Sequence, residues 1–119
     1  VTLNLFYNKL GDKGISHVSN CLKTNKVLTS LNMAKNQMGD AGMKSVAEMI
    51  RYHKHLKVLD VSRNDISLEG WMPLTGAVQG SPSLETVRVN HSNLRVKQLK
   101  GTEKTLAMIL EGNKDEEGE

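Results

Sequence analysis

Apolar and polar residues recur along this chain with a period of 28 residues. Each unit opens with an apolar, a variable and an apolar residue, followed by two variable residues, an asparagine, any residue and a further apolar one. The first apolar positions of the four units are Leu3, Leu31, Leu59 and Val87. A constant period of this length is typical of a solenoid, in which each unit buries its apolar face only against its neighbours.

Each unit has two halves that differ in the spacing of their apolar residues. Residues 30–33 alternate between polar and apolar, which is the two-residue period of a short strand. In the second half, apolar residues three and four apart predict the buried face of a helix. These residues are Ile15, Val18, Cys21 and Leu22 in the first unit, Met43, Val46, Met49 (or Ala47) and Ile50 in the second, and Trp71, Leu74, Ala77 and Val78 in the third. Right-handed strand–helix–strand connections then predict a parallel sheet covered by helices on one side.

Turn residues mark the start of each predicted helix. Gly-Asp pairs precede the first two helices, and we expect Asp12 and Asp40 to be their N-caps. The third unit has Ser67 in a similar place. We expect its Pro73 to lie in the first turn of the helix, where proline is tolerated.

Two stretches of the chain resemble a known repeat. Residues 28–38 and 56–66 are similar to the LxxLxLxxNxL consensus of leucine-rich repeats. The 28-residue period and the helical second half resemble the ribonuclease-inhibitor-like class of that family, which is typically intracellular. The resemblance covers about residues 1–94. It implies an α/β leucine-rich-repeat solenoid with parallel strands on the concave face and helices on the convex face.

An asparagine follows each of the first three predicted strands, where the chain bends away from the sheet. A side-chain amide at this place donates to and accepts from backbone groups of adjacent turns. Leaving such groups buried and unpaired costs about 1–3 kcal/mol each. We therefore interpret Asn8, Asn36 and Asn64 as a structural ladder and not as catalytic residues.

The fourth unit departs from the repeat. Ser92 stands where the ladder asparagine is expected, and Gln98 replaces the glycine that the other units have at the helix start. Thr102 falls where the earlier helices have an apolar residue. An apolar series nevertheless continues through Leu99, Leu106, Ile109 and Leu110, and it predicts a helix over residues 97–111 that closes the core.

These patterns predict one domain and a tail. Residues 1–113 form a leucine-rich-repeat domain of about four units, the last of them degenerate and cap-like. Because the chain begins with Val1 in mid-unit and solenoid ends need capping, we expect it to be a fragment of a longer protein. Residues 114–119 hold one lysine and four acidic residues, which predicts a solvated acidic tail.

Composition and net charge restrict the cellular compartment and the class of partner that we expect. The net charge of +3 is too small and too scattered to indicate nucleic-acid binding. The single cysteine excludes an internal disulfide and favours a reducing compartment, so we expect a cytoplasmic location. Neither a signal peptide nor an apolar stretch of roughly 20 residues is present, and a membrane partner is not expected.

The variable positions between the repeated ones are where a partner would bind. In a curved solenoid they form columns along the concave face. The columns are Asn4, Asn32, Asp60 and Arg88; Phe6, Ala34, Ser62 and Asn90; Tyr7, Lys35, Arg63 and His91; and, at the rim, Lys9, Gln37, Asp65 and Asn93. The third column places an aromatic ring and cations in line, which suits an acidic or phosphorylated segment of another protein. The candidate binding residues are Tyr7, Lys35, Arg63, His91, Phe6, Asn32, Asp60 and Arg88.

No pattern points to catalysis, a metal or a cofactor. His53 and His55 have a His-x-His spacing but no nearby cysteine or third ligand, which is a weak metal signal. Phosphate-binding glycine loops and nucleophile elbows are absent from the sequence. Cys21 falls on the predicted core face of a helix, so we interpret it as a small core residue rather than a nucleophile. No small-molecule substrate is expected.

The main functional hypothesis is a non-catalytic protein-interaction scaffold, and two alternatives stay open. Residues 47–67, and the irregular unit that begins at Val87, are similar to the C-terminal repeats of tropomodulins. That weaker resemblance implies binding to actin pointed ends. A second alternative is a GTPase activator resembling the Ran GTPase-activating protein. Such an activity needs a positioned arginine, and Arg63, beside a ladder asparagine, is the one at a matching kind of position.

Overall fold

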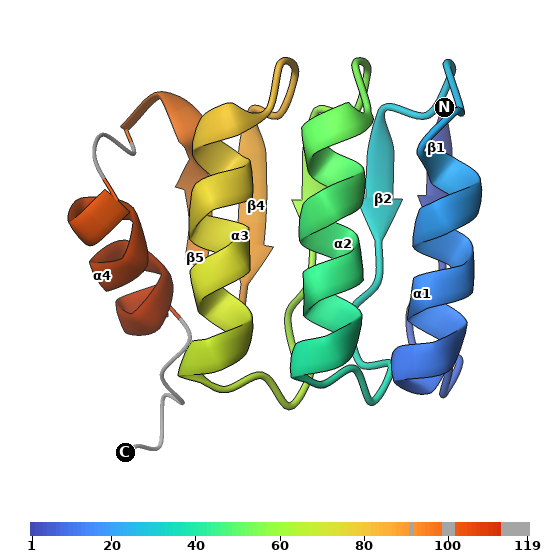
Figure 1. The fold of residues 1–119 in the computed structure, drawn as a ribbon, viewed down its shortest axis with the longest axis horizontal. Coiled ribbons are helices and arrows are strands. Elements are labelled where there is room, and N and C mark those ends of the chain that lie inside the picture. The colour runs from blue at the N-terminus through green and yellow to red at the C-terminus, as the bar shows by residue number, and fades with distance from the viewer. Residues whose placement is uncertain (91, 99–101, 113–119) are drawn as a thin grey trace.

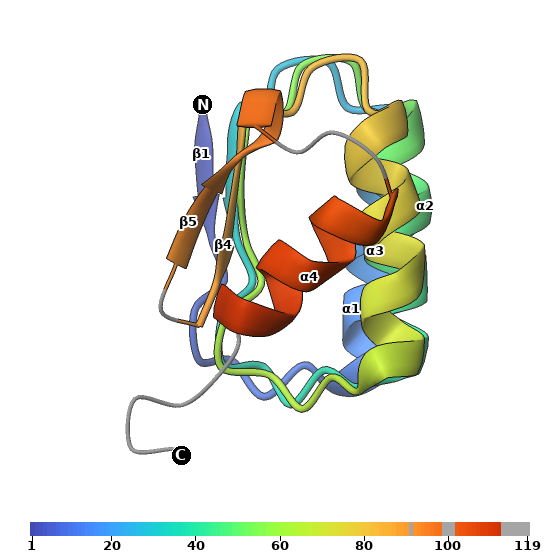
Figure 2. The ribbon, with the colours of Figure 1, turned by 90° about the vertical axis from the view of Figure 1, so that its left-hand side faces the viewer.

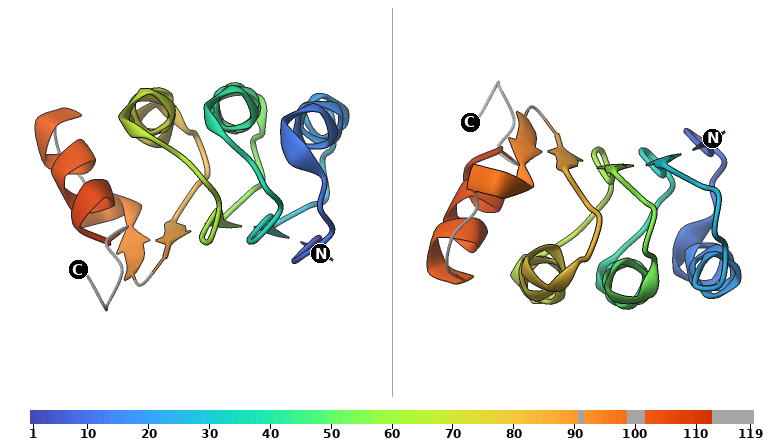
Figure 3. Two further views of the ribbon diagram at one scale, coloured as in Figure 1. Left: turned by 90° about the horizontal axis from the view of Figure 1, so that it is seen from below. Right: turned by 90° about the horizontal axis from the view of Figure 1, so that it is seen from above.

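Short strands and longer helices alternate along the chain in the computed structural model, which describes residues 1–90, 92–98 and 102–112. The strands form one sheet, and the first three helices lie side by side on one of its faces (Figures 1 and 3). The elements are β1 (Thr2–Asn4), α1 (Gly11–Leu22), β2 (Ser30–Asn32), α2 (Asp40–Tyr52), β3 (Val58–Asp60), α3 (Leu68–Gly80), β4 (Thr86–Val89), β5 (Ser92–Arg95), the 3-10 helix η1 (Val96–Gln98) and α4 (Thr102–Gly112). This arrangement confirms the predicted α/β repeat fold.

The register of the sheet follows the sequence period. Strands β1 to β4 are parallel, and each of the first three pairs with the strand of the next unit 28 residues on, as in Leu3 with Leu31 and Leu59 with Val87. The central apolar residue of β2, β3 and β4 is buried in each case. Within the described residues, no α-helix lies on the opposite face of the sheet (Figure 2). The repeat therefore leaves one sheet face open to solvent.

The helices bury the faces that the sequence predicts, with one exception. All the predicted core residues of α2 and α3 are buried, and so are Ile15 and Leu22 of α1, whereas Val18 of α1 is half-buried and packs against the core. The prediction that Cys21 is a core residue was wrong, because its free thiol is exposed. Its equivalents Met49 and Ala77 are buried because α2 and α3 lie between two helices, whereas α1 has a helix on one side only (Figure 1).

The helix starts differ from the prediction in how they are capped. Asp12 and Asp40 are not N-caps of their own helices, because the N-cap positions of α1 and α2 are Leu10 and Gly39. Each aspartate instead accepts hydrogen bonds from the start of the next helix along the chain. Pro73 lies inside α3, beyond its first turn, and not in the first turn as predicted.

The fourth unit folds as a hairpin followed by an oblique helix. Strand β5 is antiparallel to β4, with Val87 opposite Leu94. Helix α4 contacts α3 and β5, and it lies across the C-terminal end of the repeats at an angle to the other helices (Figure 2). The predicted helix over 97–111 was wrong at its start, since residues 96–98 form a 3-10 turn and α4 begins at 102.

Not every predicted core residue of the fourth unit is buried. Ile109 is fully buried, whereas Leu110 is 38% exposed and does not belong to the core. Leu99 and the predicted tail over 114–119 lie outside the described residues. Helix α4 nevertheless packs beside α3 at the end of the core. Thr105 of α4 accepts a hydrogen bond of 2.8 Å from Gln79 of α3.

Candidate functional site

The first predicted column shapes the turns that follow the strands. The side-chain oxygens of Asn4, Asn32 and Asp60 each accept a hydrogen bond of 2.9 Å from the backbone N–H two residues on. These are Asx turns, which bend the chain directly after the strand. The side chain of Arg88 carries only donors, so it cannot accept the hydrogen bond of an Asx turn. Strand β4 is accordingly one residue longer than its neighbours and continues into a hairpin.

Arg88 instead reaches across the open face of the sheet. Its Nε lies 4.0 Å from Oδ2 of Asp60, and its Nη1 donates to Oδ1 of Asn93 over 3.4 Å. Arg88 and Asp60 are both partly exposed, so this pair contributes little to stability. The last strands therefore carry a small polar cluster at the C-terminal side of the sheet.

The second predicted column does not form an exposed surface. Ala34 and Ser62 are only 2% and 3% exposed, and Phe6 is the exposed member of the three. Asn90 accepts a hydrogen bond of 2.7 Å from the backbone N–H of Arg63. The expectation that this column faces outward was therefore wrong for its two central residues.

The ladder asparagines join consecutive turns. Oδ1 of Asn36 accepts from the backbone N–H of Asn8 at 2.9 Å, and its Nδ2 donates to the carbonyl of Leu5 at 2.8 Å. Asn64 repeats this pattern toward the second unit, since its Oδ1 accepts from the backbone N–H groups of Asn36 and Met38. The ladder thus fixes each turn relative to the next.

Tyr7, Lys35 and Arg63 lie on these turns, beyond the strands, and we call them the turn row. All three have positive φ angles, 58°, 55° and 57°. Such left-handed backbone is uncommon for residues other than glycine. Their backbone N–H groups bond to the next unit, Tyr7 to the carbonyl of Ala34 and Lys35 to that of Ser62, each at 3.1 Å. The sequence places these residues on a strand face, but the structure places them at one end of the sheet.

The side chains of the turn row are exposed and partly brought together. Tyr7 is 55% exposed, and the ammonium of Lys35 lies 4.6 Å from the centre of its ring. The ring of Phe6 lies 6.2 Å from that of Tyr7. Arg63 is exposed in the next turn, and His91 lies outside the described residues. The turn row, together with the neighbouring Phe6, therefore presents two aromatic rings and two cations.

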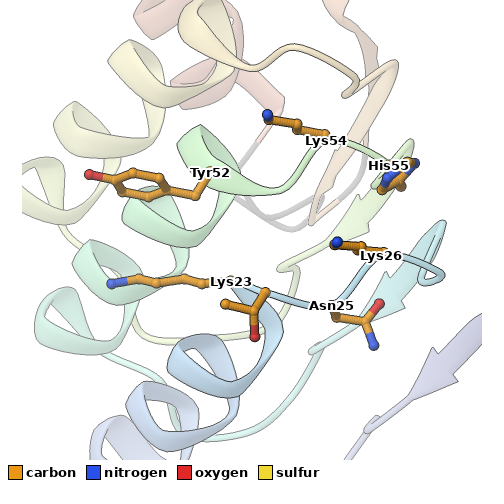
Figure 4. Close-up of a pocket in the computed structure, with 7 residues that line it drawn as sticks. Lys23, Asn25, Lys26, Tyr52, Lys54 and His55 are labelled. Atoms are coloured by element: carbon orange, nitrogen blue, oxygen red, sulfur yellow. The ribbon is translucent and has the colours of Figure 1, made fainter.

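A second cluster of cations lies at the opposite end of the molecule and was not predicted. It surrounds a hollow of about 220 Å³ between the loops that follow α1 and α2. Figure 4 shows Lys26 and Lys54 on the two neighbouring loops and Lys23 beside Tyr52. The residues that line it are Lys23, Thr24, Asn25, Lys26, Tyr52, Lys54 and His55. The sequence signal was a lysine at the same place in two consecutive units.

Polar side chains also hold these loops in shape. Asn25, His53 and Ser81 stand 28 residues apart, and each accepts hydrogen bonds from the backbone N–H groups two and three residues on. His53 accepts them at Nδ1, so the proton of the neutral ring is on Nε2. The imidazole is 1% exposed, and its Nε2 is without a hydrogen-bond partner among the described residues. Burial, and to a lesser extent the charge of His55, lower the pKa of His53.

The described residues contain neither a metal-binding cluster nor a helix that could span a membrane. No group of three or more histidine, cysteine, aspartate or glutamate side chains there is arranged to hold a metal ion. Within the same residues, no helix combines the length and apolar character needed to cross a membrane.

Comparisons with known proteins agree with the repeat architecture. A family model described as Leucine Rich repeat matches residues 1–19, 24–47 and 52–74, together more than half of the chain. No curated protein matches. Among solved structures, leiomodin-1 actin-binding site 2 is 19% identical, with a TM-score of 0.73 over 94% of this chain and 64% of that one. The tropomodulin C-terminal domain of Caenorhabditis elegans is 18% identical, with a TM-score of 0.70 over 94% and 67%. The chain thus spans about two thirds of the length of these structures, and likenesses of such low identity establish the fold alone.

Proposed function

This chain belongs to the leucine-rich repeat family, and we propose that it is a protein-binding module whose contact surface centres on the turn row. The observation that carries the proposal is the position of Lys35 over the ring of Tyr7, with Arg63 exposed in the next turn. Arginine and aromatic residues dominate the binding energy of many protein interfaces. A surface of this kind suits an acidic segment of a partner.

The backbone beneath the row supports this proposal. The turns are held by Asx hydrogen bonds, by the asparagine ladder and by backbone bonds between units. A surface whose backbone is already ordered loses less conformational entropy when it binds. Charge-assisted hydrogen bonds from Lys35 and Arg63 to carboxylates are stronger than neutral ones. The row therefore combines preorganisation with the donors that an acidic segment requires.

Charge reversal tests the proposal. The double variant Lys35→Glu, Arg63→Glu removes both donors and repels an acidic partner. Lys13→Glu, Lys44→Glu is the matched control, since it changes the net charge equally at two exposed residues of the helices. We expect the first variant to fold normally and to lose the partners that the unmodified chain captures from cell extract. Equal capture by both variants would rule out the turn row as the contact surface.

Actin binding is a second candidate function. The observation that favours it is that the match to the leiomodin-1 actin-binding site and to the tropomodulin domain covers 94% of this chain. Elongation of actin filaments from their pointed ends, with barbed ends blocked, measures this activity. Slower elongation in the presence of the chain supports it. An unchanged rate, together with no co-sedimentation with filaments, removes this candidate.

We propose that the module is non-catalytic and acts in the cytoplasm, which the free thiol of Cys21 supports. The GTPase-activator alternative depends on Arg63. Single-turnover GTP hydrolysis by small GTPases, with and without the chain, tests it. An acceleration that disappears in Arg63→Ala would overturn the non-catalytic assignment.

A further inference from the structure

The hollow between the first two units gathers cations that the repeat does not require. Lys26 and Lys54 occupy the same place in consecutive units, whereas the third unit has Pro82 there. Both side chains are exposed, and neither has an ion-pair partner within the part of the chain that the structure describes. Packing and the repeat pattern therefore leave these two lysines unexplained.

Lys23 differs from Lys26 and Lys54 because its ammonium has an ion-pair partner. It lies at the C-cap position of α1, where the helix dipole favours a cation. Its ammonium pairs with Glu48 and lies 5.7 Å from the centre of the Tyr52 ring. The hydrogen bond from Lys23, followed by its charge, lowers the pKa of Glu48. Since Glu48 offsets the charge of Lys23, the net positive charge of the hollow comes from Lys26 and Lys54.

We propose that this hollow binds a phosphate group carried on a serine or threonine side chain of a partner protein. A phosphate ester carries close to two negative charges at neutral pH and offers three acceptor oxygens. Lys26 and Lys54 supply the matching charge from two loops, and Lys23 and His55 line the same hollow (Figure 4). Charge-assisted hydrogen bonds from such donors are the strong ones.

The size of the hollow fits a small group. Sites for drug-sized molecules have volumes of about 300–1,000 Å³. The volume here, about 220 Å³, is smaller and is sufficient for a phosphate with its attached carbon. The loops are open to solvent on the outside, so a peptide chain has access. This site lies at the other end of the sheet from the turn row, and it does not depend on the function proposed for that row.

Nuclear magnetic resonance titration of the labelled chain tests the proposal. The probes are a short peptide with one phosphoserine, the same peptide with serine, inorganic phosphate, and vesicles that contain phosphatidylserine. We expect the phosphopeptide alone to shift the amide signals of residues 23–26 and 54–55 at low concentration, and higher salt to weaken binding. Lys26→Ala and Lys54→Ala should each weaken it about tenfold.

Exposed lysines on helices provide the control. Lys13→Ala and Lys44→Ala remove the same charge elsewhere and should leave phosphopeptide affinity unchanged. An equal loss of phosphopeptide affinity in these variants would show that the effect depends only on net charge, and it would overturn the site. Equal shifts with the serine peptide, equal affinity for inorganic phosphate, or binding to the vesicles only would overturn recognition of a phosphorylated side chain. Because all four lysines are exposed, the variants are expected to fold.

Discussion

Asp12 of the first unit caps the helix of the second unit through Gly42. Oδ1 of Asp12 accepts a hydrogen bond of 2.9 Å from the backbone N–H of Gly42 and one of 2.6 Å from that of Gly39. The first N–H groups of a helix have no partner inside the helix, and a carboxylate is favoured beside them. Asp40 makes a related contact with the third unit, where it accepts from the backbone N–H and the hydroxyl of Ser67, the N-cap residue of α3. Capping in this protein therefore joins units to each other.

Removing this carboxylate should destabilise the chain. Asp12→Ala leaves the N–H groups of Gly39 and Gly42 without their acceptor, and we expect a loss of about 1 kcal/mol in the free energy of unfolding. Urea denaturation followed by circular dichroism measures it. Asp65→Ala is the control, because Asp65 is an exposed aspartate in a turn. A loss as large in Asp65→Ala would contradict a specific role for Asp12.

A side chain at Gly42 should be harmful for the same reason. A Cβ there would lie 2.6 Å from Oδ1 of Asp12 and 2.7 Å from Cγ of Met38, so Gly42→Ala displaces the capping carboxylate. Gly76→Ala is the matched comparison within a helix. Its Cβ would meet only the end of the exposed Arg51 side chain, which can move away.

We expect opposite signs from these two substitutions. Gly42→Ala should lower the free energy of unfolding by at least as much as Asp12→Ala, whereas Gly76→Ala should raise it by up to about 1 kcal/mol through helix propensity. Combining Asp12→Ala with Gly42→Ala should give less than the sum of the single effects, because both break the same contact. Stabilisation by Gly42→Ala would show that the cap is unimportant.

Much of the fold follows from the spacing of apolar residues, because the period assigns Leu31, Leu59 and Val87 to one buried sheet face. The cap by Asp12 was not predictable in this way. N-cap rules concern residues near in sequence, and this acceptor lies 30 residues from Gly42. Cys21 was misassigned because burial on a helix face also depends on a neighbouring helix.

The sequence indicated which residues form the turn row, but it did not indicate where in the fold they lie. Tyr7, Lys35 and Arg63 can be read from the variable positions of the repeat, but an alternating pattern does not reveal that the strands end at Asn4 and its equivalents. The hairpin in the fourth unit had a sequence signal. Asn90 and His91 separate two short alternating segments, which is the length of a tight hairpin connection. The sequence prediction instead treated these residues as the strand and turn of a degenerate repeat unit.

An asparagine of the ladder should contribute most to the free energy of unfolding where it is buried. Asn36 is fully buried and bonds to turns on both sides, whereas Asn8 occupies the same place in the exposed first turn. Asn36→Ala leaves several backbone groups unpaired, each at a cost of about 1–3 kcal/mol. We expect it to lower the free energy of unfolding much more than Asn8→Ala. Equal effects, measured by urea denaturation, would show that burial of the ladder is not what makes it stabilising.

His53 should make stability depend on pH. Its folded-state pKa is lowered by burial and by His55, so the folded chain binds fewer protons than the unfolded chain. Its contribution is therefore complete above the unfolded-state pKa of about 6.5 and is lost as the pH falls through the lower folded-state value. Protonation would also remove the acceptor for the backbone N–H groups of His55 and Leu56.

Asn25 offers the matched substitution for His53. It makes the equivalent two hydrogen bonds in the first unit without a titrating group. His53→Asn should keep the loop and reduce the loss of stability below about pH 6.5, while the other histidines stay the same. Thermal unfolding at a series of pH values tests this. The same pH dependence in His53→Asn and the unmodified chain would exclude His53 as its source.

The most direct test of the proposed function is photo-crosslinking from the turn row. A benzophenone amino acid replaces Tyr7 in one variant and Met72, an exposed residue of α3, in another. We predict that position 7 crosslinks a partner from cell extract, that Met72 does not, and that Lys35→Glu with Arg63→Glu abolishes the crosslink. Crosslinking at Met72 instead of position 7, or a crosslink at position 7 that survives the charge reversal, would contradict binding through the turn row.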